Sequence, residues 1–455
     1  MLRCWILIAF AVYFVCDVGA NDSLSSVPQD TLNNNHPNFV NKAIETLWEE
    51  RKKMKYTPLE KVEIAGYPNV EFYFKLEYNS TTGNLKHRFA WCLFVWAITE
   101  GYVKEGTPIY EASSGNTATS EAYFAQLLGL PFVAVVPNTT APDKIEHIKH
   151  YNGTIIECAA AEIFDRAAAE AKKHNGFFMN QFVNANPAEE YRNHAFKKRG
   201  LNSTHESVNV LYEIAVQIAQ MNANSEVLEY PDYIVHSAGT GGKLWTLFVT
   251  MLIARNVDFN WTLRTKIPTT DSSGLSRHSI FNLLRLRNQP QIHERKRSVR
   301  LATSWNGRHR FRICRPGTIR QYYKVSKRIA HHKFVFSLQP AIVDRAFKVA
   351  DLASTAGILA LQSIGNKTLR GGTSSGLNFV AALAVAARNK SSNNKQKTKI
   401  AVILGDNSDL YTGTYLNESW IDVKFAKMGG IKIYNCWLNV LNETVISGRP
   451  QDRVL

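Results

Sequence analysis

The amino-acid sequence predicts an α/β protein with mostly parallel sheets. Short apolar segments typical of buried strands alternate with helix-like segments through residues 107–182. Glycine-rich turns follow several of the predicted strands. A hydrophobic content of 45% and a charged content of 20% fit a globular chain. Because helices join successive strands, we expect those strands to run parallel. A chain of 455 residues is long enough for two or three domains or for one large two-lobed unit.

The first region of alternating elements has a regular order. We expect strands over 107–112, 131–137, 154–159 and 177–182, and helices over 117–130, 141–153 and 161–176. A second α/β unit follows: residues 231–255 predict a strand, a glycine turn and a helix. Residues 379–390 predict a core helix, 391–399 an exposed linker, and 399–417 a buried strand that runs into a polar loop.

The N-terminus predicts a secretory signal peptide over residues 1–20. Arg3 precedes an apolar core over 4–16, and small residues follow before Asn21. An apolar core of thirteen residues is short for a bilayer span, so we expect cleavage and no membrane span afterwards. Ten N-glycosylation sequons, one of them at Asn79, support a secreted glycoprotein or one in the lumen of the secretory pathway.

Cysteine usage predicts no metal site. After signal cleavage four cysteines remain, at Cys92, Cys158, Cys314 and Cys436, and they have no metal-ligand spacing. In an oxidising compartment they can form one or two disulfides, whose pairing the spacing leaves open.

The net charge of +16 belongs to one segment. Residues 261–340 hold 18 Lys and Arg side chains and two acids, and the rest of the chain is balanced. The segment can be a patch for nucleic acid or another polyanion, a basic insertion of no defined structure, or a mistranslated stretch. Aromatic residues are not interleaved regularly with the basic ones, so we expect no nucleic-acid partner.

Three Gly/Ser turns carry candidate binding chemistry. Gly239-Thr240-Gly241-Gly242 follows a predicted strand and opens a helix, where backbone N–H groups can cradle a phosphate. The "SSGNT" turn over 113–117 places hydroxyls and an amide at a helix N-terminus, which suits a carboxylate or a phenolic oxygen; simple N-capping is the alternative. A third turn, "GGTSSG", covers 371–376.

In this order, the motifs resemble the fold-type-II pyridoxal-phosphate enzymes, specifically the cysteine synthase and cystathionine β-synthase-like group, with a tryptophan synthase β-like domain. "STTGNLKHR" (80–88) resembles the segment that carries the Schiff-base lysine, which falls on Lys86. Asn116 follows that lysine by thirty residues, as in the family. "QFVNANP" (181–187) and "VILGDNSDLYTGTYL" (402–416) resemble two later family motifs.

The resemblance implies a role for each matching residue. Pyridoxal 5'-phosphate would be bound by Lys86, Asn116, Gly239, Thr240, Gly241, Gly242, Lys243 and either Asn407 or Ser408. The substrate carboxylate would be bound by Ser113, Ser114, Gly115, Thr117 and Gln181. The implied reaction is β-elimination from an amino acid such as serine or O-acetylserine, through a Lys86 Schiff base and an aminoacrylate, with addition of a thiol or sulfide. The resemblance also implies a homodimer.

The family pattern further implies two lobes, each a mostly parallel sheet flanked by helices. We expect a smaller lobe over 92–194 and a larger one from 21–91 and 195–455, with a poorly packed basic insert at 273–336. That insert is the strongest departure from the family; Lys243 in place of a threonine is another. A glycan on Asn79 would crowd the cofactor cleft. The alternative is therefore a secreted relative that keeps the fold, and perhaps ligand binding, without catalysis.

Overall fold

The computed structural model describes residues 37–185, 187–188, 210–222, 228–237, 280–285, 320–322, 345–365, 368–389 and 397–449. Its helices are α2 (Pro37–Lys53), α3 (His87–Thr99), α4 (Asn116–Leu127), α5 (Pro142–Lys149), α6 (Ile163–Lys173), α8 (Val210–Met221), α10 (Asp351–Ile364), α11 (Thr373–Asn389), α12 (Glu418–Lys424) and α13 (Gly430–Ser447). Short 3-10 turns are η1 (Glu77–Asn79), η3 (Ser408–Tyr411) and η4 (Ala426–Met428).

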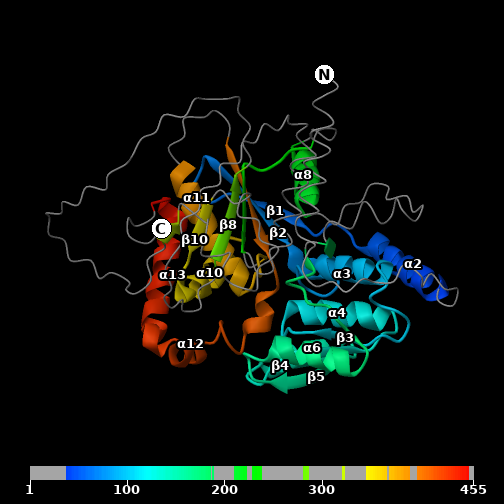
Figure 1. Cartoon of the computed structure of the whole chain (residues 1–455). Coiled ribbons are helices and arrows are strands. Elements are labelled where there is room, and N and C mark those ends of the chain that lie inside the picture. Colours follow the sequence, from blue (N-terminus) through cyan, green and yellow to red (C-terminus); the bar gives the residue numbers. More distant parts are fainter. Residues whose placement is uncertain are drawn as a thin grey trace, which may run out of the picture.

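The strands form two sheets, which Figure 1 shows in two parts of the molecule. The seven-stranded sheet has the order β1-β2-β11-β7-β8-β10-β9, and the four-stranded sheet has the order β5-β4-β3-β6. In chain order the strands are β1 (Leu59–Val62), β2 (Val70–Leu76), β3 (Ile109–Glu111), β4 (Phe132–Pro137), β5 (Thr154–Cys158), β6 (Phe177–Phe178), β7 (Tyr233–Ser237), β8 (Ile280–Arg285), β9 (Arg320–Tyr322), β10 (Arg345–Lys348) and β11 (Thr398–Leu404).

The four-stranded sheet is parallel throughout, as the alternating sequence pattern predicts. Its helices α4 and α5 follow β3 and β4, while α6 packs against β3 and β4 and then leads back to β6 at the other edge. The α/β class and all seven elements expected between residues 107 and 182 are confirmed, with strand and helix ends that differ by a few residues.

The seven-stranded sheet is parallel only at its centre. β11 pairs in parallel with β2 and with β7, whereas β1, β8, β10 and β9 pair antiparallel with their neighbours. β8 and β9 fall inside the basic segment 273–336, so two short pieces of it join this sheet. The rest of that segment lies outside the described residues, and its expected poor packing stays a prediction, as do the lobe boundaries.

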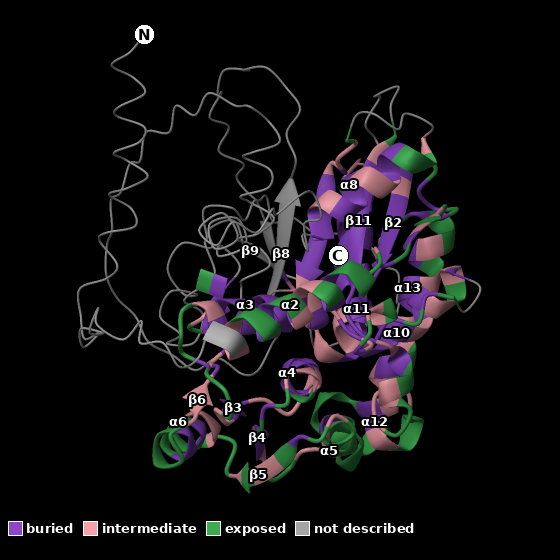
Figure 2. Ribbon diagram, turned by 90° about the vertical axis from the view of Figure 1, so that its right-hand side faces the viewer, coloured by how far each residue is buried: buried purple, intermediate pink, exposed green. Residues whose placement is uncertain are grey.

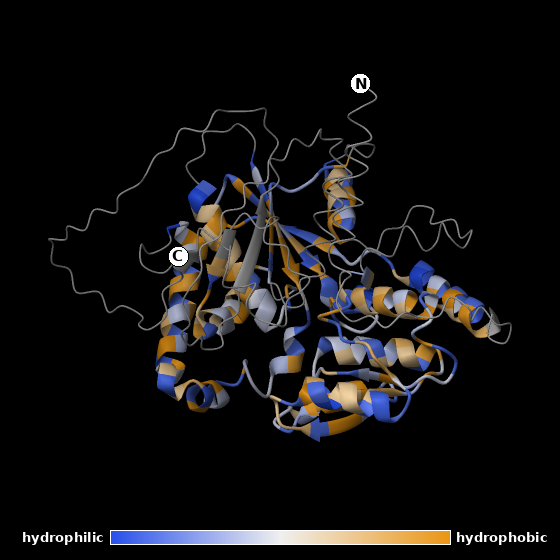
Figure 3. Ribbon diagram, in the orientation of Figure 1, coloured by the Kyte–Doolittle hydropathy of each residue, from blue (hydrophilic) through white to orange (hydrophobic). Residues whose placement is uncertain are grey.

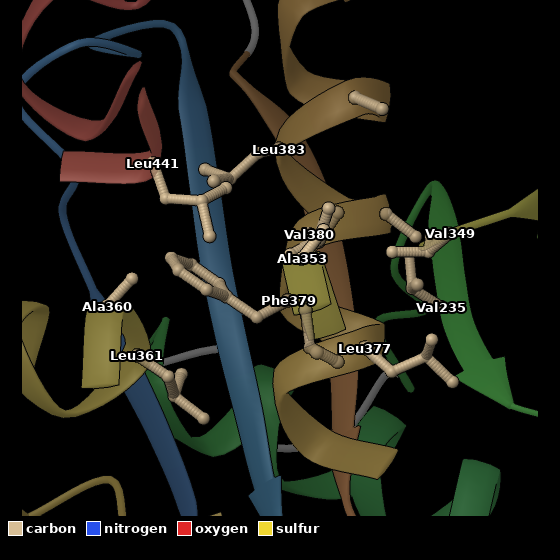
Figure 4. Close-up of a cluster of buried hydrophobic side chains, with 14 of the residues drawn as sticks. Val235, Val349, Ala353, Ala360, Leu361, Leu377, Phe379, Val380, Leu383 and Leu441 are labelled. Carbon is tan, nitrogen blue, oxygen red and sulfur yellow. The ribbon is translucent and has the colours of Figure 1, made fainter. Parts of the chain in front are cut away.

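The two largest hydrophobic cores among the described residues hold these sheets. One lies between the large sheet and α10, α11 and α13, and the other between α2, α3, α4 and the small sheet. Figure 4 shows Phe379 and Leu383 of α11 in the first core, together with Leu441 of α13. Strands β2 and β11 are buried along most of their length (Figure 2), and most of their residues are apolar (Figure 3). Buried parallel strands are typically continuous apolar runs, which β11 confirms.

Within the described part of the chain, no helix is both long enough and apolar enough to cross a membrane.

Candidate active site

Lys86 lies at the start of α3, at the end of the turn that follows β2. Its backbone N–H donates to Asn84 Oδ1 at 2.8 Å, and Ser120 Oγ of α4 donates to the same oxygen at 3.1 Å. Asn84 also forms an isolated antiparallel bridge with Asp406, just beyond β11, and Leu85 N donates to Gly405 O at 2.7 Å. The turn is therefore fixed to both α4 and the end of β11, so the backbone of Lys86 is held in one place.

The "SSGNT" turn connects β3 to α4, as expected. Gly115 precedes the helix and Asn116 is its first residue. Asn116 Nδ2 donates to Asp406 Oδ2 at 2.9 Å, and Thr117 Oγ1 donates to Gln181 Oε1 at 2.6 Å. The structure thus brings the predicted pair Thr117 and Gln181 into contact, although 64 residues separate them in the chain.

Asp406 is a central residue of the site that the sequence reasoning missed. It is 3% exposed and accepts hydrogen bonds from Asn116 and, at 2.6 Å, from Tyr411 Oη. Burial raises the pKa of the Asp406 carboxyl, although both hydrogen bonds act in the opposite direction. A Cβ on Gly372 would approach Asp406 Oδ1 to 2.4 Å, so the "GGTSSG" turn fits closely against this carboxyl. The sequence signal that could have identified Asp406 is its position as an acid two residues after the end of a buried strand.

The structure separates the two candidates for the pyridine-nitrogen contact. Asn407 is partly exposed and lines a cavity with Asn116, whereas Ser408 is buried and its Oγ accepts from Gln362 Nε2 at 3.0 Å. This geometry favours Asn407. Its Oδ1 already accepts from Asp409 N at 3.0 Å, which leaves the amide NH₂ to face a ligand.

The cavity beside Asn116 has a volume of about 280 Å³, which is near the lower end of small-molecule sites. Of the predicted site residues, Ser114, Gly115, Asn116 and Asn407 line it. Among the residues that the structure describes, Lys86, Ser113, Thr117, Gln181 and Ser408 do not. Gly83 and Asn84 of the Lys86 turn do line it, so the turn that carries Lys86 borders the cavity.

The Lys86 amine lies 5.0 Å from the centroid of the Phe89 ring, within cation–π range. Burial raises the pKa of two nearby acids, Glu111 of β3 and Glu121 of α4, and the positive charge of Lys86 opposes that rise in each. Sequence reasoning missed both acids, because nothing in their local sequence shows that they are buried.

The predicted phosphate turn, Gly239 to Lys243, lies outside the described residues. The preceding strand β7 ends at Ser237 and is a parallel neighbour of β11. The carboxyl ends of these two strands therefore share the sheet edge at which Gly405 and Asp406 lie. In open α/β sheets ligands bind beyond that edge.

Comparison with known proteins places the chain in a family. The model for the family described as pyridoxal-phosphate dependent enzyme matches residues 51–252. The chain is 34% identical to a pyridoxal-phosphate dependent protein of Caenorhabditis elegans, over 89% of this chain and 86% of that protein. This chain is a member of the pyridoxal-phosphate-dependent enzyme family. It is also 30% identical to the L-cysteine desulfhydrase of Mycobacterium tuberculosis, over 78% of this chain and 81% of that protein.

Solved structures of pyridoxal-phosphate-dependent enzymes share the fold. An O-ureido-L-serine synthase matches with a TM-score of 0.52 at 18% identity, over 84% of this chain and 98% of that one. A cysteine synthase from Entamoeba histolytica matches with a TM-score of 0.52 at 16% identity, over 92% and 99%. The fold-type-II architecture expected from the sequence is therefore confirmed.

The family cofactor is pyridoxal 5'-phosphate, and the residues of this site fit it. The turn of Lys86 borders a cavity that Asn116 and Asn407 line with amide groups, beside a buried carboxyl that both Asn116 and Tyr411 hold in place. Lys86 would hold the cofactor covalently, Asn116 and Asn407 would orient its ring, and the turn after β7 would take its phosphate. Bound there, the cofactor supplies an electron sink for negative charge at the substrate Cα.

Proposed function

We propose that this protein is an enzyme that eliminates or replaces the β-substituent of a small amino acid, in the manner of cysteine synthases and cysteine desulfhydrases. The observation that carries the proposal is the convergence at Asp406. Its backbone pairs with the Lys86 turn through Asn84, and its side chain binds Asn116. Residues from three segments distant in the sequence thus line one cavity.

We assign each of the following site residues a task in this reaction. Lys86 is the base that takes the Cα proton, because its amine is the basic group of the turn that borders the cavity. Ser114 at the start of α4 offers a hydroxyl to the substrate carboxylate, where the helix dipole also favours negative charge, and Gly115 lines the cavity beside it. Ser113, Thr117 and Gln181 support that turn: Ser113 Oγ accepts from Gly115 N at 3.3 Å, and the other two bind each other.

The relatives narrow the substrates to test. The desulfhydrase acts, by its name, on L-cysteine, and the synthase structures are those of cysteine and O-ureido-L-serine synthases. Serine, O-acetylserine and cysteine are therefore the first substrates we propose, with a thiol or sulfide as the incoming or leaving group.

Lys86→Ala tests the proposal. The full chain with added pyridoxal 5'-phosphate should show a visible absorbance band that borohydride abolishes. The reduced cofactor should then be found attached to Lys86 by peptide mass spectrometry. Lys86→Ala should lack that adduct and lose turnover by about a thousandfold or more, as expected when a covalent nucleophile is removed. Lys149→Ala, an exposed change on α5, is the matched control and should keep both. Absence of the band in the unaltered chain would contradict the proposal.

A second candidate is a secreted relative without turnover, which the signal-like residues 1–20 and the basic segment 273–336 favour. A cofactor band that no amino acid shifts would identify it. Asn79 is exposed and, with Ser80 and Thr81, lines a second cavity of about 240 Å³. Asn84 lines both this cavity and the one beside Asn116, so the expected crowding of the cofactor cleft by a glycan on Asn79 stays a prediction.

We further propose entry into the secretory pathway, based on residues 1–20, and a homodimer, based on the family resemblance. Mass spectrometry of the N-terminus and of the Asn79 peptide from secreted protein tests the first. Light scattering tests the second.

A further inference from the structure

The Asp406 side chain binds one end of the Asn116 amide. Asn116 Nδ2 donates to Asp406 Oδ2 at 2.9 Å, across 290 residues of chain, and Tyr411 Oη donates to the same oxygen at 2.6 Å. This oxygen therefore offers Asn116 an acceptor. If the Asn116 amide were turned over, its own oxygen would face Asp406 Oδ2, and two acceptors would meet without a proton between them. Asp406 thus determines which way the Asn116 amide is turned.

That orientation decides what Asn116 presents to a ligand. Among the described residues, Asn116 lines the cavity, whereas Asp406 is 3% exposed and does not line it. The amide nitrogen carries two hydrogens, of which Asp406 takes one, so Asn116 keeps a second N–H on the same nitrogen. An N–H suits an acceptor such as the phenolic oxygen of the cofactor, and an amide oxygen turned the same way would repel it.

The backbone and the side chain of Asp406 have separate contacts. Its backbone pairs with Asn84, and its carbonyl oxygen accepts from Gly372 N at 2.9 Å. In the side chain, the second oxygen Oδ1 is buried and has no hydrogen-bond partner among the described residues. A buried polar atom without a partner is unfavourable, so the carboxyl adds less to stability than a fully paired group would. A substitution of the side chain leaves the backbone contacts in place.

We propose that Asp406 is a positioning residue, which turns the Asn116 amide so that an N–H is available to the phenolic oxygen of the cofactor. Tyr411 holds the carboxyl in place. The inference rests on the proposed function, because Asn116 is assigned to the cofactor by resemblance. The role needs an acceptor oxygen at position 406 and needs no charge. Asparagine there meets this need, since its amide oxygen can take the place of Oδ2 and its NH₂ the place of the unpaired Oδ1.

A double-mutant cycle on cofactor affinity in the full chain tests the proposal, using Asn116→Ala, Asp406→Ala and the double variant. The dissociation constant of pyridoxal 5'-phosphate is measured from its visible absorbance. Asp406→Ala should weaken binding about tenfold, the loss of roughly one hydrogen bond. In the Asn116→Ala background the same substitution should change affinity by less than about twofold, because Asp406 acts through Asn116. A tenfold loss in both backgrounds would overturn the proposal, since a merely structural effect would be additive.

Asp406→Asn separates orientation from charge. It keeps an acceptor oxygen, so the affinity for pyridoxal 5'-phosphate should stay within about threefold of wild type. A loss as large as that of Asp406→Ala would contradict the assigned role. Asp165→Ala, which removes an exposed aspartate of α6, is the matched control and should leave the affinity unchanged.

The same cycle in urea unfolding of the cofactor-free chain distinguishes this inference from the proposed function. The Asn116 and Asp406 substitutions should be coupled by about fivefold in the unfolding equilibrium constant, because the two side chains bind each other without a ligand. Additive effects would overturn the contact on which the inference depends. Coupling in a wild-type chain that fails to bind pyridoxal 5'-phosphate would instead overturn the proposed function, and with it the use of the Asn116 N–H, while the contact itself would stand.

Discussion

Two clusters of charged residues with buried acids lie at α3, and they are built in opposite ways. The balanced cluster consists of Lys75, Glu77, Arg88 and Glu213. The acid-rich cluster consists of Lys86, Glu111 and Glu121. In the balanced cluster Arg88 binds both acids, at 2.8 Å to Glu77 Oε1 and 2.7 Å to Glu213 Oε1, and Lys75 binds Glu213 Oε2 at 2.8 Å. In the acid-rich cluster one carboxyl lacks a well-aligned partner.

This difference distinguishes a cluster that stabilises the fold from one that is suited to chemistry. The balanced cluster ties α3 to β2 and α8, and Thr57 Oγ1 donates at 2.8 Å to Glu77 Oε1, the same oxygen that Arg88 binds. In this cluster each acid has at least one basic partner. The acid-rich cluster is incompletely paired and has one group with a pKa of about 7, which is a feature of functional sites.

Arg88→Met should have the largest effect on stability. It leaves Glu77 and Glu213 buried without their shared cation, and breaking a buried pair in this way costs about 3–5 kcal/mol. Urea unfolding of the full chain measures the change. Lys61→Met is the matched control: it removes a short pair, 2.6 Å to Glu71, whose lysine is 32% exposed, and it should cost less than about 1 kcal/mol. An equal loss in the free energy of unfolding for the two variants would show that the buried network contributes no more than an exposed ion pair.

The same contrast shows which features of the fold and the site could be predicted from the sequence and which could not. Alternation of strands and helices predicts the small sheet, because those patterns are local. The order of motifs predicts the family, and the family resemblance predicts one site for Lys86 and Asn116; that site stays a prediction. Glu111, Glu121 and Asp406 were missed because their importance comes from burial, and burial arises when α4 and β11 pack against the Lys86 turn. The antiparallel edge strands were missed for the same reason: their pairing is long-range.

The pH dependence of stability should differ between wild type and Glu111→Gln. The folded pKa of Glu111 is about 7 against a model value of 4.5, so the folded state binds more protons between these values. Wild-type stability should therefore fall, relative to Glu111→Gln, as pH rises from 4.5 to 7, by roughly 3 kcal/mol in total. His87, whose pKa burial lowers to about 3, has the opposite effect, but equally in both proteins, so it cancels in the difference. A constant difference across this range would contradict a raised Glu111 pKa.

Glu121→Met should have the smallest effect, and of opposite sign. The Glu121 carboxyl is buried without a well-aligned partner, so an apolar side chain of similar length removes a desolvation penalty. We expect the free energy of unfolding to rise by about 1 kcal/mol, measured by urea unfolding at pH 7. In the balanced cluster the same kind of change, Glu77→Met, should destabilise, because it leaves Arg88 with one acid fewer. If Glu121→Met destabilised the chain as Glu77→Met does, Glu121 would be a structural residue like those of the balanced cluster. A gain would indicate that the chain keeps this acid at the expense of stability, as proteins do at working sites.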